Sequence, residues 1–332
     1  MDGGEWARAR RWSLDVMAAA MGAQLITVNV TPDGRGDAVV CGRFVKPEER
    51  RMTFAQFAAA LREREGGLQG SRGTLKELLL KKGVHYLSLQ DDNLRTEHPQ
   101  LASDVPSSVT WFEEALGCAP DAVNLWVGDE RAMSAVHADH YENLYCVISG
   151  EKVFTLLPPA DAISRDLAPR PVGRFAQRTD GAWEVCDEEA PSGGVVGADG
   201  DTAGLGGGLG GGDGGGLAGG LGGGDGGELG GSFVEWIGID PAEPEQLPAL
   251  SGAVTVRVGA GEMLYLPANW FHRVTQSAQT VAVNYWHDPL QSAVPPGQIL
   301  AQFARKVHRA LHGHGSRDRQ ADAGTADSKL IS

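Results

Sequence analysis

The stretch that decides the fold is Ser134-Ala-Val-His137-Ala-Asp139-His140-Tyr-Glu-Asn143-Leu-Tyr145-Cys-Val-Ile-Ser-Gly150-Glu-Lys152. It places a His-x-Asp pair ahead of an apolar run, a Ser-Gly turn and a single lysine. Residues two apart on a β-strand point to the same face, so His137 and Asp139 can both reach one metal ion while Ala138 faces away. The stretch therefore predicts a metal site on a β framework.

Short apolar runs, separated by Gly and Pro, surround this stretch. They predict strands at 123–127, 144–148, 153–157, 254–258, 263–266 and 281–286. Closely spaced short strands of this kind are typical of an antiparallel sandwich or barrel, so the fold is expected to be mainly β. Ahead of them, the chain predicts helices at 12–21 and 52–61, with Ser13 and Thr53 as N-caps, and strands at 24–30 and 83–90.

The chain of 332 residues is expected to divide as follows: a mixed α/β flank at 1–120, a barrel core at 121–290, an amphipathic helix at 291–312 and a polar tail at 313–332. A Gly-rich insertion at 193–232 interrupts the core. Two copies of Gly-Gly-Gly-Asp-Gly-Gly are similar to calcium-binding nonapeptide repeats, but such repeats stack only when there are several. The composition favours a disordered insertion in a surface loop, and the helix is expected to pack on the barrel or to pair two subunits.

The composition narrows the partners of the chain. A net charge of -14 argues against nucleic acid and suits a basic peptide or protein. The four cysteines are scattered without a CxxC pair, which fits the reduced thiols of a cytoplasmic or nuclear protein. The chain shows neither a secretory signal nor an apolar run long enough to cross a membrane.

A third ligand is available in Trp270-Phe-His272-Arg. Two histidines and one carboxylate occupy one face of an octahedron and leave three positions open, as in non-haem iron(II) oxygenases. A structural zinc site would instead need four ligands. Two alternatives stay open on this reasoning. His140 could be the ligand in place of a member of the adjacent His137–Asp139 pair, and Lys152 could be a solvated turn lysine rather than a buried cation.

Longer motifs add a family resemblance. The segment from His137 to Lys152 with the following Pro158-Pro159, together with Gly259-Ala-Gly-Glu-Met-Leu-Tyr-Leu-Pro-Ala-Asn-Trp-Phe-His272 and Val283-Asn284-Tyr-Trp286, resembles the Jumonji-C oxygenases. The similarity runs from about residue 10 to 311 outside the glycine tract, and within the family it is closest to a lysyl hydroxylase subgroup. It implies a double-stranded β-helix, a cupin-like jelly-roll barrel, with flanking α-helices.

The resemblance also implies a set of site residues. Iron(II) would be bound by His137, Asp139 and His272, and 2-oxoglutarate by Lys152 and the Tyr86 hydroxyl. The remaining residues that the resemblance assigns to the co-substrate are Asn143, Asn284 and Ser134. The implied reaction uses dioxygen and 2-oxoglutarate to hydroxylate a C–H bond and releases succinate and CO2.

The substrate implied by the resemblance is a protein lysine, hydroxylated at C-3, in a translation-associated GTPase. A lysine would favour an acidic or aromatic pocket mouth, and the residues nearest the motifs are Glu142, Asp288, Tyr145 and Trp270. Two other classes stay open: a metallopeptidase that cuts near lysine or arginine, and a non-catalytic cupin that binds a partner. Family members usually have more sequence ahead of Trp12, so the N-terminus is expected to be truncated.

Overall fold

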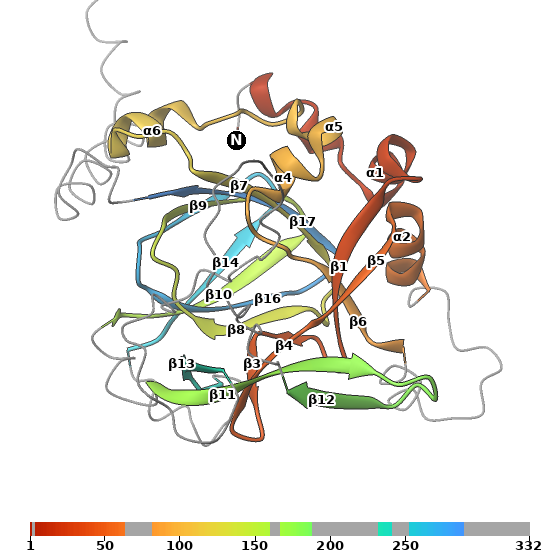
Figure 1. The fold of residues 1–332 in the computed structure, drawn as a ribbon. Coiled ribbons are helices and arrows are strands. Elements are labelled where there is room, and N and C mark those ends of the chain that lie inside the picture. Colours follow the sequence, from red (N-terminus) through yellow and green to blue (C-terminus); the bar gives the residue numbers. More distant parts are fainter. Residues whose placement is uncertain (2–3, 64–81, 160–166, 188–231, 241–251, 289–332) are drawn as a thin grey trace, which may run out of the picture.

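The computed structural model describes residues 1, 4–63, 82–159, 167–187, 232–240 and 252–288. Two β-sheets face each other in it, and a third sheet lies below them (Figure 1). The glycine tract, the expected C-terminal helix with its proposed subunit pairing, and the polar tail lie outside the described residues.

The major sheet has seven strands, and its pairings are all antiparallel. Its strand order is β15 (Met263–Leu266), β9 (Glu142–Ser149), β17 (Thr280–His287), β7 (Ala122–Gly128), β6 (Val84–Leu87), β1 (Leu25–Thr31) and β5 (Glu48–Thr53). The N-terminal third of the chain thus extends the same sheet that carries the centre of the barrel.

The minor sheet faces the major one and has five strands. Its order is β14 (Val254–Gly259), β10 (Glu151–Leu157), β16 (Phe271–Gln276), β8 (Met133–His137) and β2 (Arg35–Gly36). Buried side chains of both sheets form one apolar cluster that includes Tyr145, Phe154 and Val274. This interior cluster makes the two sheets the halves of one barrel, as the cupin-like prediction requires.

The third sheet covers the outside of the minor sheet's end, at the bottom of Figure 1. It contains β12 (Trp183–Asp187), β11 (Leu167–Gln177), β4 (Arg43–Lys46) and β3 (Ala38–Val40), and β13 (Phe233–Ile237) pairs with β11. Strand β13 directly follows the glycine tract in sequence, so the two strands that flank the tract, β12 and β13, both lie on this sheet.

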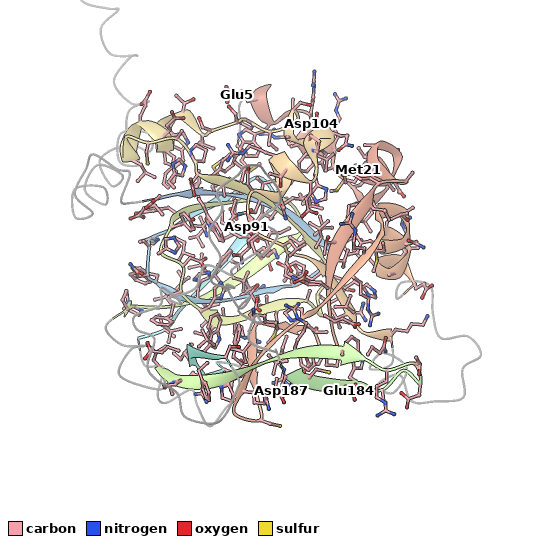
Figure 2. All side chains as sticks on the ribbon, viewed as in Figure 1. Glu5, Met21, Asp91, Asp104, Glu184 and Asp187 are labelled. Carbon is pink, nitrogen blue, oxygen red and sulfur yellow. The ribbon has the colours of Figure 1, made fainter. Side chains whose placement is uncertain are left out.

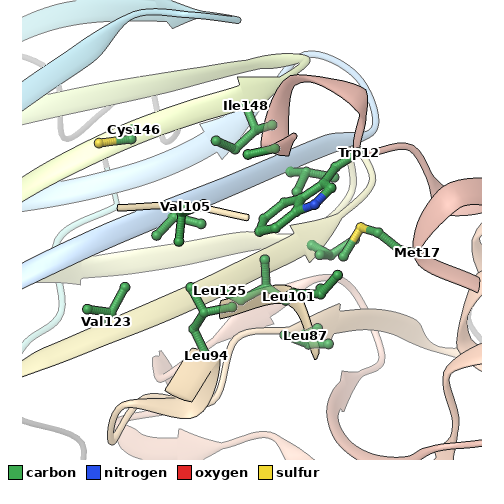
Figure 3. Close-up of a cluster of buried hydrophobic side chains, with 14 of the residues drawn as sticks. Trp12, Met17, Leu87, Leu94, Leu101, Val105, Val123, Leu125, Cys146 and Ile148 are labelled. Carbon is green, nitrogen blue, oxygen red and sulfur yellow. The ribbon is translucent and has the colours of Figure 1, made fainter. Parts of the chain in front are cut away.

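Helices cover the outer face of the major sheet. They are α1 (Leu14–Met21), α2 (Phe54–Arg62), α4 (Asn93–Thr96), α5 (Pro99–Ala102) and α6 (Thr110–Leu116), with two 3-10 turns at Gly4–Trp6 and Ala9–Arg11. Figure 3 shows Trp12 and Met17 packed over Leu125 and Ile148 of the sheet. Apolar cover on both faces explains why β9 is buried along nearly its whole length.

The local signals that the sequence predicts are present at the helix starts. The Ser13 hydroxyl accepts a hydrogen bond from Val16 N at 3.2 Å, and Thr53 forms a capping box with Gln56. The hairpin between β9 and β10 turns at Gly150, whose φ is +77°. An added Cβ there would lie 2.4 Å from Gln279 O, so both the backbone angle and the space demand glycine.

Candidate metal centre and co-substrate pocket

Strand pairing brings the predicted metal ligands together. His137 ends β8, Asp139 follows two residues later, and His272 lies on β16. In the β8–β16 ladder His272 is the direct partner of His137, so residues far apart in sequence face the same side. Asp139 and His272 are buried, and the ligand atoms of the three residues all lie within 4.8 Å of one another.

The donor atoms converge on a common point. Asp139 Oδ1 lies 3.9 Å from His137 Nε2, and Asp139 Oδ2 lies 3.6 Å from His272 Nε2. Adjacent ligands of an ion bound at about 2.1 Å are separated by roughly 3 Å, so a modest contraction places all three on one metal. Burial lowers the pKa of His272 and raises that of Asp139.

Both imidazole rings are oriented by the backbone. His137 Nδ1 lies 2.7 Å from Ala135 O, and His272 Nδ1 lies 3.0 Å from Trp270 O. A carbonyl can only accept, so each Nδ1 carries the hydrogen and each Nε2 presents a lone pair toward Asp139. This is the tautomer that a metal ligand needs, and it is fixed before any ion is bound.

The donor set fits a catalytic metal rather than a structural one. Within the described ranges no further His, Cys, Asp or Glu joins His137, Asp139 and His272 to make a fourth ligand. His140, the alternative ligand, is exposed and its ring lies against Tyr141, with ring centroids 4.1 Å apart. Two nitrogens and one carboxylate with open positions suit iron(II).

Lys152 is buried deep in the barrel and is only 1% exposed. Its Nζ donates a hydrogen bond to the Tyr86 hydroxyl at 2.8 Å, and no acidic side chain in the described part of the chain forms an ion pair with it. Burial lowers the pKa of Lys152 to about 7. The structure thus excludes the solvated turn lysine and shows a buried cation without an anion.

Hydroxyl groups surround the same point. The Ser134 and Tyr145 side chains lie beside the Tyr86 hydroxyl, and burial raises the pKa of that hydroxyl. Three hydroxyls on the cavity wall, with an ammonium one hydrogen bond behind them, are donors of the kind that bind a carboxylate. Ser134 and Tyr86 therefore lie where a co-substrate carboxylate would bind, and Tyr145, which the sequence suggested for the pocket mouth, belongs to this inner group.

The two asparagines occupy the wall of the major sheet. Trp126 Nε1 donates to Asn284 Oδ1 at 2.9 Å, and Asn284 Nδ2 donates to Asn143 Oδ1 at 3.2 Å. All three side chains are buried. Asn143 lines the same cavity as the three candidate metal ligands, and this row of hydrogen bonds holds its side chain there.

One cavity connects these groups. It is lined by Tyr86, Gln90, Trp126, Ser134, His137, Asp139, Asn143, Tyr145, His272, Val274, Asn284 and Trp286. Lys152 is not on its wall and reaches it through the Tyr86 hydroxyl. Every residue predicted to bind the metal or the co-substrate is thus on the cavity or one hydrogen bond behind it.

Sequence reasoning missed parts of this cavity. Gln90 stands just after β6, and only its place at the end of an alternating run hinted at it. Of the side chains suggested for the pocket mouth, Glu142 instead accepts a hydrogen bond from the Tyr265 hydroxyl at 2.6 Å, and Trp270 packs against the barrel's interior cluster. Asp288 directly follows β17 and is not among the residues that line the cavity.

The chain is similar to known proteins over most of its length. The model of a family described as "Cupin-like domain" matches residues 2–293. The human protein named "bifunctional peptidase and (3S)-lysyl hydroxylase JMJD7" is 37% identical over 290 residues, which cover 85% of this chain and 74% of that protein. The "JmjC domain-containing protein E" of Dictyostelium discoideum is 30% identical over 85% of this chain and 75% of its own length.

A plant relative carries a different activity in its name. The "lysine-specific demethylase JMJ32" of Arabidopsis thaliana is 29% identical over 85% of this chain and 72% of that protein. None of the helices in the described ranges is long and apolar enough to cross a bilayer.

Proposed function

The chain belongs to the cupin-like Jumonji-C family of 2-oxoglutarate oxygenases, and we propose that it hydroxylates the side chain of a lysine in a protein substrate. The observation that carries this proposal is a cavity lined by His137, Asp139 and His272, whose wall residue Tyr86 is hydrogen-bonded to the buried Lys152. Iron(II) with 2-oxoglutarate would there supply the oxidation of a C–H bond by dioxygen, with succinate and CO2 as co-products.

The residues of the chain have separate tasks in this reaction. His137, Asp139 and His272 would hold the metal ion, and no fourth His, Cys, Asp or Glu of the described residues joins them. Lys152 and Tyr86 bind the far carboxylate of 2-oxoglutarate, which supplies the charge that the buried ammonium lacks. The apolar side chains Phe154 and Val274 keep water from the centre of the barrel.

A lysine substrate is supported by the human relative, whose name records (3S)-lysyl hydroxylase activity. The resemblance to its subgroup supports hydroxylation at C-3 and a translation-associated GTPase as the target. That name also records a peptidase. We favour the hydroxylase because a buried lysine next to a hydroxyl cluster has a role in binding a dicarboxylate and none in peptide hydrolysis.

The test is to incubate the protein anaerobically with iron(II), 2-oxoglutarate and a lysine-bearing GTPase peptide, and then to admit oxygen. Hydroxylation adds the mass of one oxygen atom to the peptide, with one succinate formed per peptide. Asp139→Ala abolishes both products, and Lys152→Met abolishes them at ordinary 2-oxoglutarate concentrations. Peptide cleavage that proceeds without 2-oxoglutarate would show the peptidase instead, and binding without turnover would show the non-catalytic module.

A further inference from the structure

Gln276 is a buried amide beside Lys152 in the interior of the barrel. It is the direct partner of Lys152 in the ladder between β10 and β16, so the two side chains point to the same face with Cβ atoms about 4.5–5.5 Å apart. That face is the interior one, because Phe154 and Val274, two residues away on the same strands, belong to the interior cluster. Gln276 is 4% exposed and, like Lys152, stands behind the cavity wall.

The backbone fixes which way the Gln276 amide faces. Its Nε2 donates a hydrogen bond to Asp129 O. A carbonyl can only accept, so the opposite orientation would put Gln276 Oε1 against Asp129 O and is excluded. Asp129 is itself held in place by Arg131, whose guanidinium pairs with its carboxylate at 2.6 Å. Gln276 Oε1 is therefore turned away from this carbonyl.

The Gln276 Oε1 atom is a buried acceptor with no hydrogen-bond partner in the part of the chain that the structure describes. A buried acceptor that stays unpaired is costly, so it calls for a donor. Lys152 has the opposite shortage. Its ammonium has three N–H donors, and among the described residues the Tyr86 hydroxyl is the acceptor that Nζ has. The unpaired acceptor and the unpaired donors thus belong to residues that face each other in the ladder.

The Tyr86 ring lies against both groups. Lys152 Nζ is 4.9 Å from the centre of that ring. A Cβ added to Gly128 would lie 2.7 Å from Tyr86 Cδ2 and 2.7 Å from Gln276 Nε2, so the amide approaches the same ring. The ladder and the ring together bring the amide and the ammonium to one part of the interior.

We propose that Gln276 is a positioning residue of the co-substrate site: its Oε1 accepts a hydrogen bond from the Lys152 ammonium when the far carboxylate of 2-oxoglutarate is bound. This inference rests on the proposed function and adds a residue to its co-substrate site. Rotation about the side-chain bonds of Lys152 brings Nζ to Oε1, because the two residues are ladder partners. The three donors of the ammonium are then used by the Tyr86 hydroxyl, the far carboxylate and Gln276 Oε1.

The test measures 2-oxoglutarate binding to the protein loaded with manganese(II), by calorimetry, in wild type and Gln276→Leu. A hydrogen bond to a charged group contributes about ten- to a hundredfold to affinity, so Gln276→Leu raises Kd at least about tenfold. A second ligand, 2-oxopentanoate, has a methyl group in place of the far carboxylate and binds both proteins equally. In turnover, KM for 2-oxoglutarate rises while kcat and KM for the peptide stay unchanged.

Gln24→Leu is the matched control. Gln24 has the same two features, because its Nε2 donates to Glu97 O and its buried Oε1 has no partner within the described ranges. Gln24 N also donates to Met21 O at 2.7 Å, which places it beside the end of α1 in the helical layer (Met21 is labelled in Figure 2). Both variants lower Tm, and Gln24→Leu keeps the wild-type Kd for 2-oxoglutarate.

Two results would overturn the inference. One is an equal Kd for 2-oxoglutarate in Gln276→Leu and wild type, and the other is an equal loss of affinity for 2-oxoglutarate and 2-oxopentanoate, which would show a general distortion of the cavity. Thermal melting confirms that Gln276→Leu is folded. If it is not, Gln276→Met takes its place, because methionine has the length of glutamine without the amide.

Calorimetry needs neither peptide nor oxygen, so it separates this inference from the proposed function. A tenfold loss of 2-oxoglutarate affinity in Gln276→Leu, with no oxygen added to a lysine peptide by the wild type, keeps the role of Gln276 and overturns the lysyl hydroxylase. Hydroxylation of the peptide with equal KM for 2-oxoglutarate in both proteins overturns the role of Gln276 and keeps the hydroxylase.

Discussion

Lys152 Nζ donates a hydrogen bond to the Tyr86 hydroxyl across 2.8 Å, inside a barrel that shields both side chains almost completely from solvent. Burial lowers the pKa of Lys152 to about 7, so about half of the free protein carries an ammonium at neutral pH. A bound carboxylate favours the charged form and raises that pKa again. Co-substrate binding and protonation of Lys152 are therefore linked.

The first prediction is that 2-oxoglutarate binding takes up a proton above pH 7. At pH 8 Lys152 is mostly neutral in the free protein and charged in the complex, so uptake approaches about 0.9 proton per site. Affinity is highest below pH 7 and falls as pH rises, up to about tenfold per unit. Calorimetry of the iron-free protein in two buffers of different ionisation enthalpy measures the uptake.

The control for proton uptake is Lys82→Met, which removes an exposed lysine and leaves the uptake unchanged. Affinity for 2-oxoglutarate that stays constant from pH 6 to pH 9 would contradict the linkage.

The second prediction is that Lys152→Met stabilises the protein while it removes 2-oxoglutarate binding. Folding moves an ammonium out of water without an anion, and methionine fills a similar volume without that cost, so the gain is on the order of 1–3 kcal/mol. The folded-state pKa lies below the unfolded one. The destabilisation of the folded wild type by the buried ammonium is therefore greatest below pH 7, and it decreases as the pH rises toward about 10.4. Urea unfolding at pH 7 and pH 9 measures the difference, and a variant less stable than wild type at pH 7 refutes it.

The barrel and half of the metal site could be predicted from local pattern. The two-residue period of a strand puts His137 and Asp139 on one face, and the strands between Gly and Pro positions recur in the structure. His272 is more than a hundred residues away, and the ladder that pairs it with His137 brings it to the candidate metal site. That pairing depends on the whole barrel, so the sequence could offer His272 as a third ligand but could not show from local pattern that it lies beside His137.

Burial and loop order could not be predicted in the same way. On composition Lys152 is a surface lysine, and it is buried because strands β14 and β16 lie on both sides of β10. Gln90 and Trp286 are far apart in sequence, and both line one cavity because β6 and β17 belong to the same sheet. The cytoplasmic or nuclear location stays a prediction from the scattered cysteines.

The third prediction concerns the metal. Manganese(II), a redox-stable substitute for iron(II), stabilises the wild type by about 2.7 kcal/mol at 100 times its Kd, which raises Tm by roughly 5–10 °C. Asp139→Ala loses this shift because the remaining histidines bind without the anionic ligand. His140→Ala is the matched control, since that histidine is exposed, and it keeps the shift. If the Tm shift is lost in His140→Ala and kept in Asp139→Ala, His140 binds the metal and Asp139 does not.

The fourth prediction is that Tyr86→Phe weakens 2-oxoglutarate binding and also lowers stability by about 1–3 kcal/mol, because Lys152 Nζ loses the acceptor of its hydrogen bond. A hydrogen bond to a charged carboxylate contributes about 1.5–3 kcal/mol, so KM for 2-oxoglutarate rises roughly ten- to a hundredfold. Tyr285→Phe is the control, because its hydroxyl donates to Pro106 O at 2.7 Å outside the cavity. That control lowers stability by about 1 kcal/mol and leaves KM unchanged. Equal KM values in Tyr86→Phe and wild type would remove Tyr86 from the co-substrate site.

The fifth prediction is that Gly128→Ala disturbs the co-substrate site from behind. A Cβ there would lie 2.7 Å from Tyr86 Cδ2 and 2.7 Å from Gln276 Nε2, closer than real contacts allow. Gln276 is held in place by Asp129 O, so the Tyr86 ring must shift and its hydroxyl leaves the optimum for a carboxylate. Overpacking costs about 1–3 kcal/mol, and KM for 2-oxoglutarate rises several-fold.

The matched control for this overpacking is Gly22→Ala. Its Cβ would lie 2.5 Å from Ala18 O, at the end of α1 and away from the cavity. Both variants lose stability in urea unfolding, and Gly128→Ala alone weakens 2-oxoglutarate binding, because only its added methyl group contacts Tyr86. If Gly128→Ala loses stability but binds 2-oxoglutarate as tightly as Gly22→Ala, the position of the Tyr86 ring does not control the affinity, and the binding of the far carboxylate then rests on Lys152 without Tyr86.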